Sequence, residues 1–561
     1  MLENRTNRTR LFLVGVILAT AALWVGVVGI GVNADDYEGI AAASPIHNVG
    51  DLTRPFLVPD PNPSYFRPAS AITMSLDFLL FGWNGHMFHL TSLLAHLLVT
   101  ALVFYLARDI FTLTEGEALI AALIFGLAAS HESNLTVDAM RVDVMLAIFV
   151  LLTLLLEYRA RVRDSSGYRL AAIFAFALAV LAKESAIVLL ILIPALLWNR
   201  SGNRFDWPRE LRRLAPYFLA TVLLYFYRAH FTTNPLASQA LSAEGTYSFL
   251  AAARNGAYAL GYTVLPLNFE TATSLITGYG VTALIAGGIL TIILLWALVC
   301  GNSQRTLLWQ PTLFMLLTGG VLMLSFERWR LYVPSAGLFI FLTILVNRNR
   351  FRSVRILSIA IAILLGAFHI LRALSAQAEW RESTAMKDRM MSSLSHILDS
   401  IPQRPLTLGI LVCPSKLGSA SVMMPGMSSM VQRAEADRIS EDNRRDATVN
   451  GVQVSEWEAI LAYAADRKEG FRSLNMKRLD HYHFDVSSAE HLLLYPSIIP
   501  ENGIARRDLG LQPRMIFDMP GATDSVCDTH LGAAWRMLIS IKDSSAVLLS
   551  YVPDSGFVLL H

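Results

Sequence analysis

The segment Leu11–Val32, LFLVGVILATAALWVGVVGIGV, contains no charged side chain and is long enough to cross a bilayer as a helix. Comparable apolar segments recur as far as residue 374. They predict an all-α polytopic membrane domain with about eleven transmembrane helices. The expected spans are residues 11–32, 87–107, 117–130, 142–156, 170–182, 186–198, 214–227, 280–300, 306–325, 331–346 and 354–374. Only 16% of the residues are charged, against about 25% in soluble proteins, so a soluble globular protein is excluded.

The distribution of arginine predicts which ends of these helices face the cytoplasm. Arg5, Arg8 and Arg10 precede the first span, which lacks a cleavage site and is expected to be retained. The loops 158–169 and 199–213 carry four and five arginines, and short basic loops stay inside. Both loops can be cytoplasmic only if residues 170–198 cross twice, with Lys183 and Glu184 at the outer turn.

The basic segment 347–355 is likewise cytoplasmic only if the weaker apolar segment 248–267 is re-entrant or interfacial. An outer loop at 33–85 then contains a short amphipathic helix at 69–81, which starts at Pro68 and is too short to span. The remaining polar segments at span ends converge on the same outer face, as expected for a functional cavity.

The chain changes character near residue 375. We expect a membrane domain at 1–375 and a small extracytoplasmic α/β domain at 376–561. In this second domain, LTLGILV, EHLLLYP and SAVLLSYV read as buried strands, the segment that begins SAQAEW reads as a helix, and residues 455–468 are a further expected helix.

Two adjacent carboxylates, Asp35 and Asp36, follow the first span directly. They can be a solvated loop start or a helix cap. A carboxylate near hydrocarbon can also serve as a general base whose pKa is tuned by burial and by its neighbour. Three histidines of the second span, at positions 86, 89 and 96, are expected to be packed and hydrogen-bonded rather than metal ligands.

Several motifs together resemble the GT-C superfamily of integral-membrane glycosyltransferases. The similarity covers roughly residues 10–375 and is greatest to the O-mannosyltransferase branch that carries tetratricopeptide repeats, although no such repeat is present here. The motifs are the acidic pair, YFRP, SHESNLTVDAMRVD, LAKES and FERWRLYVPS. Two departures from the branch are Glu132, displaced by one residue, and Met140 in place of a glycine.

The resemblance implies transfer of a sugar from a polyprenyl-phosphate donor to an acceptor on the outer face. Guanidinium and ammonium groups would stabilise the leaving phosphate, and Asp36 or Asp35 would deprotonate the acceptor hydroxyl with inversion at the anomeric carbon. The expected phosphate-binding residues are Arg328, Arg330, Arg67, Arg141, Lys183 and Tyr332, with Arg228 a further outer-face cation; His131, Glu132, Glu184 and Glu327 are expected to support them.

Other roles stay open for several of these residues. His131 with Glu132 can bind a metal, orient the base or cap the third span, and a divalent cation is neither required nor excluded. Lys183 and Glu184 can form an ion pair with each other instead of meeting phosphate. A transporter or flippase of lipid-linked glycans is the alternative function, and a membrane scaffold is the third.

The expected partners are the lipid-linked donor, membrane lipid and a protein or glycan acceptor, with no nucleic acid. The expected location is a bacterial inner membrane, with the N-terminus in the cytoplasm.

Overall fold

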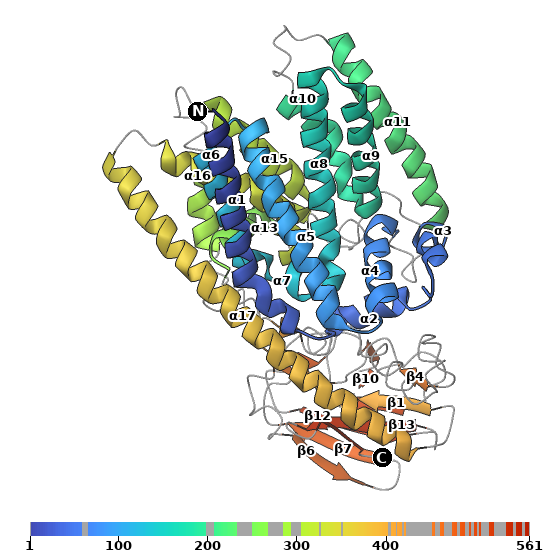
Figure 1. Cartoon of the computed structure of the whole chain (residues 1–561). Coiled ribbons are helices and arrows are strands. Elements are labelled where there is room, and N and C mark those ends of the chain that lie inside the picture. The colour runs from blue at the N-terminus through green and yellow to red at the C-terminus, as the bar shows by residue number, and fades with distance from the viewer. Residues whose placement is uncertain are drawn as a thin grey trace. The chain divides into compact units, whose positions relative to one another are not determined.

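A computed structural model describes residues 2–58, 66–197, 207–232, 249–266, 284–292, 305–324, 327–348 and 352–401, together with short segments, mostly strands, between 406 and 559. Contacts divide the chain into two compact units (Figure 1). The first comprises Met1–Gly29 and Asn48–Gln377, and the second comprises Ile30–His47 and Ala378–His561.

The first unit is entirely helical in its described part. Its helices are α1 (Leu2–Trp24), α3 (Arg54–Leu57), α4 (Pro68–Phe81), α5 (Gly85–Tyr105), α6 (Glu115–Leu127), α7 (Glu132–Thr136), α8 (Arg141–Arg163), α9 (Ser166–Ala182), α10 (Leu189–Leu197), α11 (Trp207–Phe231), α13 (Phe249–Val264), α15 (Arg305–Leu324), α16 (Tyr332–Asn347) and the first part of α17 (Arg352–Ser400). Short helical turns connect several of them, including η4 (Ala129–His131), η5 (Asp138–Met140), η6 (Glu184–Val188) and η8 (Arg328–Leu331).

Five helices among the described residues are long and apolar enough to cross a membrane: Asn7–Gly29, Gly85–Ile110, Asp138–Arg163, Arg328–Asn347 and Arg352–Ser400. A sixth crossing is formed if α6 and the bent segment Ala129–Thr136 make one broken span. Shorter apolar helices lie at Pro68–Phe81, Ser166–Ala182 and Glu184–Leu197. The chain is therefore an integral membrane protein with several apolar helices.

Several predicted elements are present with shifted bounds. The helix expected at 69–81 is α4, with Pro68 in its first turn, and the chain leaves it at Gly82 with φ +57°, a conformation that favours glycine. The segment 170–198 is broken at Lys183, whose backbone is extended between α9 and η6. Residues 248–267 contain α13. Of the span expected at 280–300, residues 284–292 are described and helical.

The bundle is built from helices that pack pairwise, with α8 beside α9, α15 beside α16 and α5 beside α6 (Figure 1). Local signals fix the helix ends. Thr114 and Glu117 form a capping box at the start of α6, in which Glu117 Oε2 accepts from the Thr114 N–H at 2.9 Å. Asp164 ends α8 in the left-handed conformation, so α9 returns antiparallel to α8. The two helices therefore carry residues 141–143 and residue 183 to the same end of the bundle.

The second unit contains α2 (Ala34–Ala43), the last part of α17 and three sheets. The strands of the sheets are ordered β14-β13-β1-β4, β6-β7-β12-β11-β10-β9 and β3-β2-β5-β8. Their bounds are β1 Leu406–Ile410, β2 Val412–Leu417, β3 Ala420–Ser421, β4 Val452–Val454, β5 Leu461–Ala464, β6 Leu474–Arg478, β7 His483–Ser488, β8 Leu493–Leu494, β9 Ile499–Glu501, β10 Ile504–Arg506, β11 Met515–Pro520, β12 Trp535–Ile541, β13 Ala546–Val552 and β14 Gly556–Leu559. The central strand β1 is parallel to both β13 and β4.

One expectation for this part of the chain is wrong. Residues 461–464 of the helix expected at 455–468 form strand β5, which pairs in parallel with β2 and antiparallel with β8. Strand pairing here overrides local helix preference. The expected span 354–374 and the expected tail helix are one uninterrupted helix, α17, of 49 residues, because no proline or glycine pair separates them.

Candidate active site

Polar segments that are distant in the sequence meet at one end of the helical bundle. The start of α8, the break between α9 and η6, the last turn of α11 and the segment Glu327–Arg330 all contribute charged side chains there. The other end of α8 meets a separate buried group, in which Arg161 contacts Glu157 and Glu210. The two charged groups thus mark opposite ends of the same 23-residue helix.

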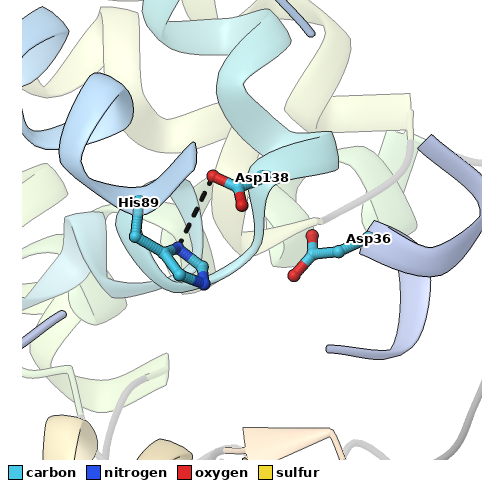
Figure 2. Close-up of side chains that lie close together, drawn as sticks. All are labelled: Asp36, His89 and Asp138. Atoms are coloured by element: carbon cyan, nitrogen blue, oxygen red, sulfur yellow. Dashed lines mark ion pairs between the residues drawn. The ribbon is translucent and has the colours of Figure 1, made fainter. Parts of the chain in front are cut away.

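Arg141 lies in a buried network at the start of α8. Its Nη1 donates to Asp77 Oδ2 at 2.5 Å and its Nη2 donates to Asp138 Oδ1 at 3.1 Å. Its Nε donates to Ser92 Oγ at 2.9 Å. His89 Nδ1 lies 3.5 Å from the same oxygen of Asp138 (Figure 2). The geometry makes Arg141 a bridge between α4, α5 and η5, and its expected contact with phosphate stays a prediction.

Lys183 also has a carboxylate partner. Its Nζ donates to both oxygens of Asp143, at 2.7 and 2.9 Å, and its side chain is nearly buried. Burial lowers the pKa of Lys183 and outweighs the opposite effect of the Asp143 carboxylate. The ion pair expected between Lys183 and Glu184 is replaced by this one, since adjacent side chains on the extended backbone at Lys183 point to different neighbours.

Glu184 bonds to two arginines instead. Arg67 donates from Nε and Nη2 to the two carboxylate oxygens, at 3.2 and 2.7 Å, in a bidentate fork. Arg228, near the end of α11, donates to Glu184 Oε2 at 3.3 Å and to the Val180 carbonyl at 3.1 Å. This one carboxylate therefore ties the start of α4 and the end of α11 to the break that follows α9.

The segment Glu327–Arg330 supplies the most exposed charges of the site. Arg330 Nη2 lies 2.5 Å from Glu327 Oε2, and 29% of the Glu327 side chain is exposed. Burial raises the pKa of Glu327, while the cations Arg330 and Lys183 act in the opposite direction. The Arg328 side chain is 20% exposed, and its Nη1 lies 3.8 Å from Oε1 of the buried Glu132. The other oxygen of this carboxylate, Oε2, accepts from Arg372 Nη2 at 3.3 Å.

In the described part of the chain, the charged groups around Lys183, Glu184 and Glu327–Arg330 contain more cations than carboxylates, and the neighbouring Arg141 network adds one arginine and two aspartates. The cations are Arg67, Lys183, Arg228, Arg328, Arg330 and Arg372, and the carboxylates are Glu132, Asp143, Glu184 and Glu327. The excess of positive charge is partly exposed at Arg67, Arg328 and Arg330. Such an arrangement suits an anionic ligand, since a low-dielectric site with a net positive charge attracts anions strongly.

Tyr332 and His131 are fully buried among histidine and aromatic rings. The Tyr332 hydroxyl is 2.6 Å from His96 Nδ1, and His131 Nε2 is 2.8 Å from Ser335 Oγ. His96 is packed and hydrogen-bonded, as the sequence predicts for histidines of this span. The Tyr332 hydroxyl, which was expected to contact phosphate, is buried and bonded to His96 in this arrangement.

Asp36 belongs to the second unit, where it lies in the first turn of α2. Its Oδ2 accepts from the Asn33 N–H at 3.0 Å, and its side chain is fully buried. Lys387 of α17 donates to Asn33 Oδ1 within the same unit. Asp36 thus has the geometry of a helix cap, one of the interpretations that the sequence left open. The side chain of Asp35 lies outside the described part of the chain, and the roles of both residues stay predictions.

Several residues of the site were not identified from the sequence. Asp77 and Asp138 are the carboxylates that meet Arg141, and Arg372 meets Glu132. Asp77 is the one acid of the apolar helix α4, and an isolated charge in an apolar segment is a signal for function. Arg372 gives no such signal. Its contact with Glu132 depends on how α17 packs against the bundle, which the sequence does not show.

Comparison with known families assigns the part of the chain that carries most of this network. Residues 63–231 match the family model of dolichyl-phosphate-mannose-protein mannosyltransferases. Over these residues the chain is similar to this glycosyltransferase family. The matched residues run from the segment before α4 to the end of α11, and they include Arg67, Arg141, Lys183 and Glu184. The segment Glu327–Arg330 and the acidic pair lie outside the match. No curated protein matches the sequence.

Solved structures that resemble this chain share little sequence with it. ArnT from Cupriavidus metallidurans, bound to undecaprenyl phosphate, is 14% identical over 85% of this chain and 96% of ArnT, with a TM-score of 0.40. The oligosaccharyltransferase AglB from Archaeoglobus fulgidus, in complex with an inhibitory peptide and dolichol-phosphate, is 11% identical over 80% of this chain and 64% of AglB, with a TM-score of 0.43.

Proposed function

We propose that this protein transfers a sugar from a polyprenyl-phosphate donor to an acceptor hydroxyl on the extracytoplasmic face of a bacterial inner membrane. The excess of cations at one end of the bundle, within and beside the residues that match the mannosyltransferase family, is the observation that supports this most strongly. About eleven spans, a cytoplasmic N-terminus and domains at 1–375 and 376–561 belong to the same proposal.

The charge of the site fits the charge that develops during the reaction. A polyprenyl-phosphate sugar is a phosphodiester with one negative charge, and the released polyprenyl phosphate carries between about one and two. Positive groups that face the leaving oxygen therefore bind the transition state more tightly than the ground state. The partly exposed Arg328, Arg330 and Arg67 are assigned to this role, because Arg141, Lys183 and Arg228 are more deeply buried against carboxylates.

Asp36 is assigned as the general base, with Asp35 orienting it. A phosphate leaving group needs no general acid, but the acceptor hydroxyl must lose a proton as it attacks the anomeric carbon. Attack opposite the phosphate inverts the configuration at that carbon. No step is assigned to a metal ion.

The experiment uses the full chain in liposomes with radiolabelled mannosyl polyprenyl phosphate and a membrane extract as acceptor. Arg328→Gln is expected to reduce transfer by about a hundredfold, the usual effect of removing one group that stabilises developing charge. Arg348→Gln is the matched control, since Arg348 pairs with Glu117 away from the site. Equal transfer by both variants would exclude the phosphate role of Arg328.

The base is tested with Asp36→Asn and Asp35→Asn as separate variants in the same assay. Loss of transfer is expected with Asp36→Asn, and a smaller loss is expected with Asp35→Asn. Full transfer by both variants would remove the acidic pair from the mechanism. A transporter or flippase would instead move labelled lipid between leaflets without breaking the sugar–phosphate bond, and the same liposomes distinguish that result.

A further inference from the structure

A buried, hydrogen-bonded group of four side chains lies next to the segment Glu327–Arg330. It contains His96 of α5, His131 of η4, and Tyr332 and Ser335 of α16, each at most 2% exposed. The His96 ring bonds at both nitrogens, Nε2 to the Gly126 carbonyl at 3.1 Å and Nδ1 to the Tyr332 hydroxyl at 2.6 Å. A carbonyl only accepts, so Nε2 carries the proton of the neutral ring and Nδ1 accepts from Tyr332.

The second bond of the group joins His131 and Ser335. Ser335 Oγ also lies 2.8 Å from the Tyr332 carbonyl, to which it donates. In the tautomer with the hydrogen on Nε2, His131 donates to this hydroxyl oxygen, 2.8 Å away. His96 thus holds the side chain of Tyr332. His131 bonds to Ser335, which in turn bonds to the backbone carbonyl of Tyr332.

The broken span explains why these groups are found here. Helix α6 ends at Leu127 and is bent by 49° from the segment Ala129–Thr136. A break in apolar surroundings exposes carbonyls that need donors. The Gly126 carbonyl accepts from both His96 and Trp24 Nε1, the latter at 2.9 Å. The bonds that satisfy the break therefore also fix the first turn of α16.

We propose that His96 and His131 are positioning residues that orient Arg328 and Arg330 toward the donor phosphate. Tyr332 follows η8, which contains both arginines. His131 directly precedes Glu132, the carboxylate that lies 3.8 Å from Arg328. The group thus adjoins both partners of the Glu132–Arg328 pair, Glu132 through His131 and Arg328 through Tyr332. This inference rests on the proposed function.

A nucleophilic role for Ser335 does not fit the same geometry. The Ser335 hydroxyl donates its hydrogen to a carbonyl, and His131 donates to the hydroxyl instead of accepting its proton. A serine nucleophile needs the opposite direction of proton transfer. Both side chains are also almost completely buried.

The test replaces His131 with glutamine or leucine in the full chain. A glutamine amide can replace the Nε2–H donor, whereas leucine fills similar space without one. The probe is geranyl phosphate, titrated against detergent-solubilised protein, with geraniol as the control for the tail. His131→Leu is expected to weaken binding of geranyl phosphate by about tenfold, with His131→Gln close to wild type. Equal binding by the leucine variant, or an equal loss with glutamine, would overturn the proposal.

A second pair of variants keeps the test decisive if His131→Leu does not fold. Tyr332→Phe removes one oxygen, and His96→Leu removes its acceptor. If the bond positions the arginines, the two losses in geranyl phosphate affinity are not additive, and the double variant binds like either single variant. A direct contact between Tyr332 and phosphate predicts instead that His96→Leu alone has no effect, which would overturn the proposal.

Arg328→Gln separates failure of this inference from failure of the proposed function. If Arg328→Gln weakens geranyl phosphate binding and the histidine variants do not, the phosphate site stands and the positioning role is wrong. If Arg328→Gln has no effect, the phosphate site itself is wrong, and the positioning role is overturned with it.

Discussion

At the scale of single residues, this protein places charges in apolar surroundings and pairs each with a defined partner. Arg141 and Lys183 meet carboxylates from other parts of the chain, and Glu184 meets two arginines. Such pairs add little stability compared with apolar side chains, but removing one partner is costly because the other remains buried and charged. The cost of each pair is therefore measurable in single variants.

The pair of Lys183 and Asp143 makes this prediction concrete. We expect Asp143→Asn to lower the free energy of unfolding by about 3 kcal/mol, because the ammonium group keeps its burial and loses its carboxylate. Since burial already lowers the pKa of Lys183 below its ordinary 10.5, the unfolded chain binds the proton more readily. The loss should shrink as alkaline pH removes that proton.

Unfolding in detergent, followed by circular dichroism, measures this effect. Lys183→Met in the Asp143→Asn background should restore most of the stability, since no unpaired charge remains. A single Asp143→Asn variant as stable as wild type would contradict the account of this pair.

The pH dependence of donor binding should report on Glu327. Burial raises the pKa of this carboxyl above its ordinary 4.5, so Glu327 takes up a proton as the pH falls through a range above 4.5. Protonation removes the ion pair to Arg330 and increases the positive charge of the site. Binding of a phosphodiester should therefore strengthen as the pH falls.

A geranyl methyl phosphate ester suits this measurement, because a phosphodiester has no second ionisation in the range used. Titrations between about pH 5 and 8 should show the dependence in wild type. Glu327→Gln should bind tightly with little dependence on pH. Parallel pH profiles of the two proteins would assign the dependence to another group.

At the scale of elements, the break after α6 organises the site. Gly126 lies at the end of α6, where a Cβ atom would overlap Thr20 Oγ1 and lie 3.1 Å from Thr100 Cγ2. Its carbonyl is also the acceptor shared by Trp24 and His96. The close approach of α1, α5 and α6 at this point therefore requires glycine.

Gly126→Ala is expected to destabilise the protein by about 1–3 kcal/mol, because overpacking at a tight contact forces the helices apart. Gly15→Ala in α1 is the matched control, since a Cβ atom there has no neighbour within 4 Å among the described residues. Thermal unfolding of both variants in the same detergent gives the comparison. An equal shift in both would show that the contact at Gly126 is not tight.

Sequence patterns predict the helices better than they predict which side chains and strands pair with one another. The apolar runs correctly indicate α5, α8, α9 and α16, and the motifs around Arg67, Lys183 and Glu327 indicate the residues that meet at one end of the bundle. The pairing itself could not be predicted, because Lys183 and Asp143 are 40 positions apart. Strand β5 was missed because its pairing with β2 depends on residues distant in the sequence.

At the scale of the whole molecule, the two ends of the bundle carry different charged groups. Arg161 and Arg213 bond to Glu210 at one end, where the basic loops are expected in the cytoplasm. The candidate site lies at the other end of α8. The proposed reaction therefore requires that the α4–α5 turn faces outward and the α8–α9 turn faces inward.

Single cysteines test this orientation. With Cys300, Cys413 and Cys527 replaced by serine, Asn84→Cys should react with an impermeant maleimide added outside intact cells. Ser166→Cys should react only after the cells are opened. Asn84 lies between α4 and α5 and Ser166 is the first residue of α9, and both are exposed, so labelling reports on the side of the membrane. Labelling of Ser166→Cys in intact cells would contradict the proposed topology.

The most direct measurement is an experimental structure of the full chain with undecaprenyl phosphate. The account predicts density for the phosphate within hydrogen-bond distance of Arg328, with Arg330 or Arg67 as a second contact. Density for the phosphate at the opposite end of the bundle, beside Arg161 and Arg213, would contradict it.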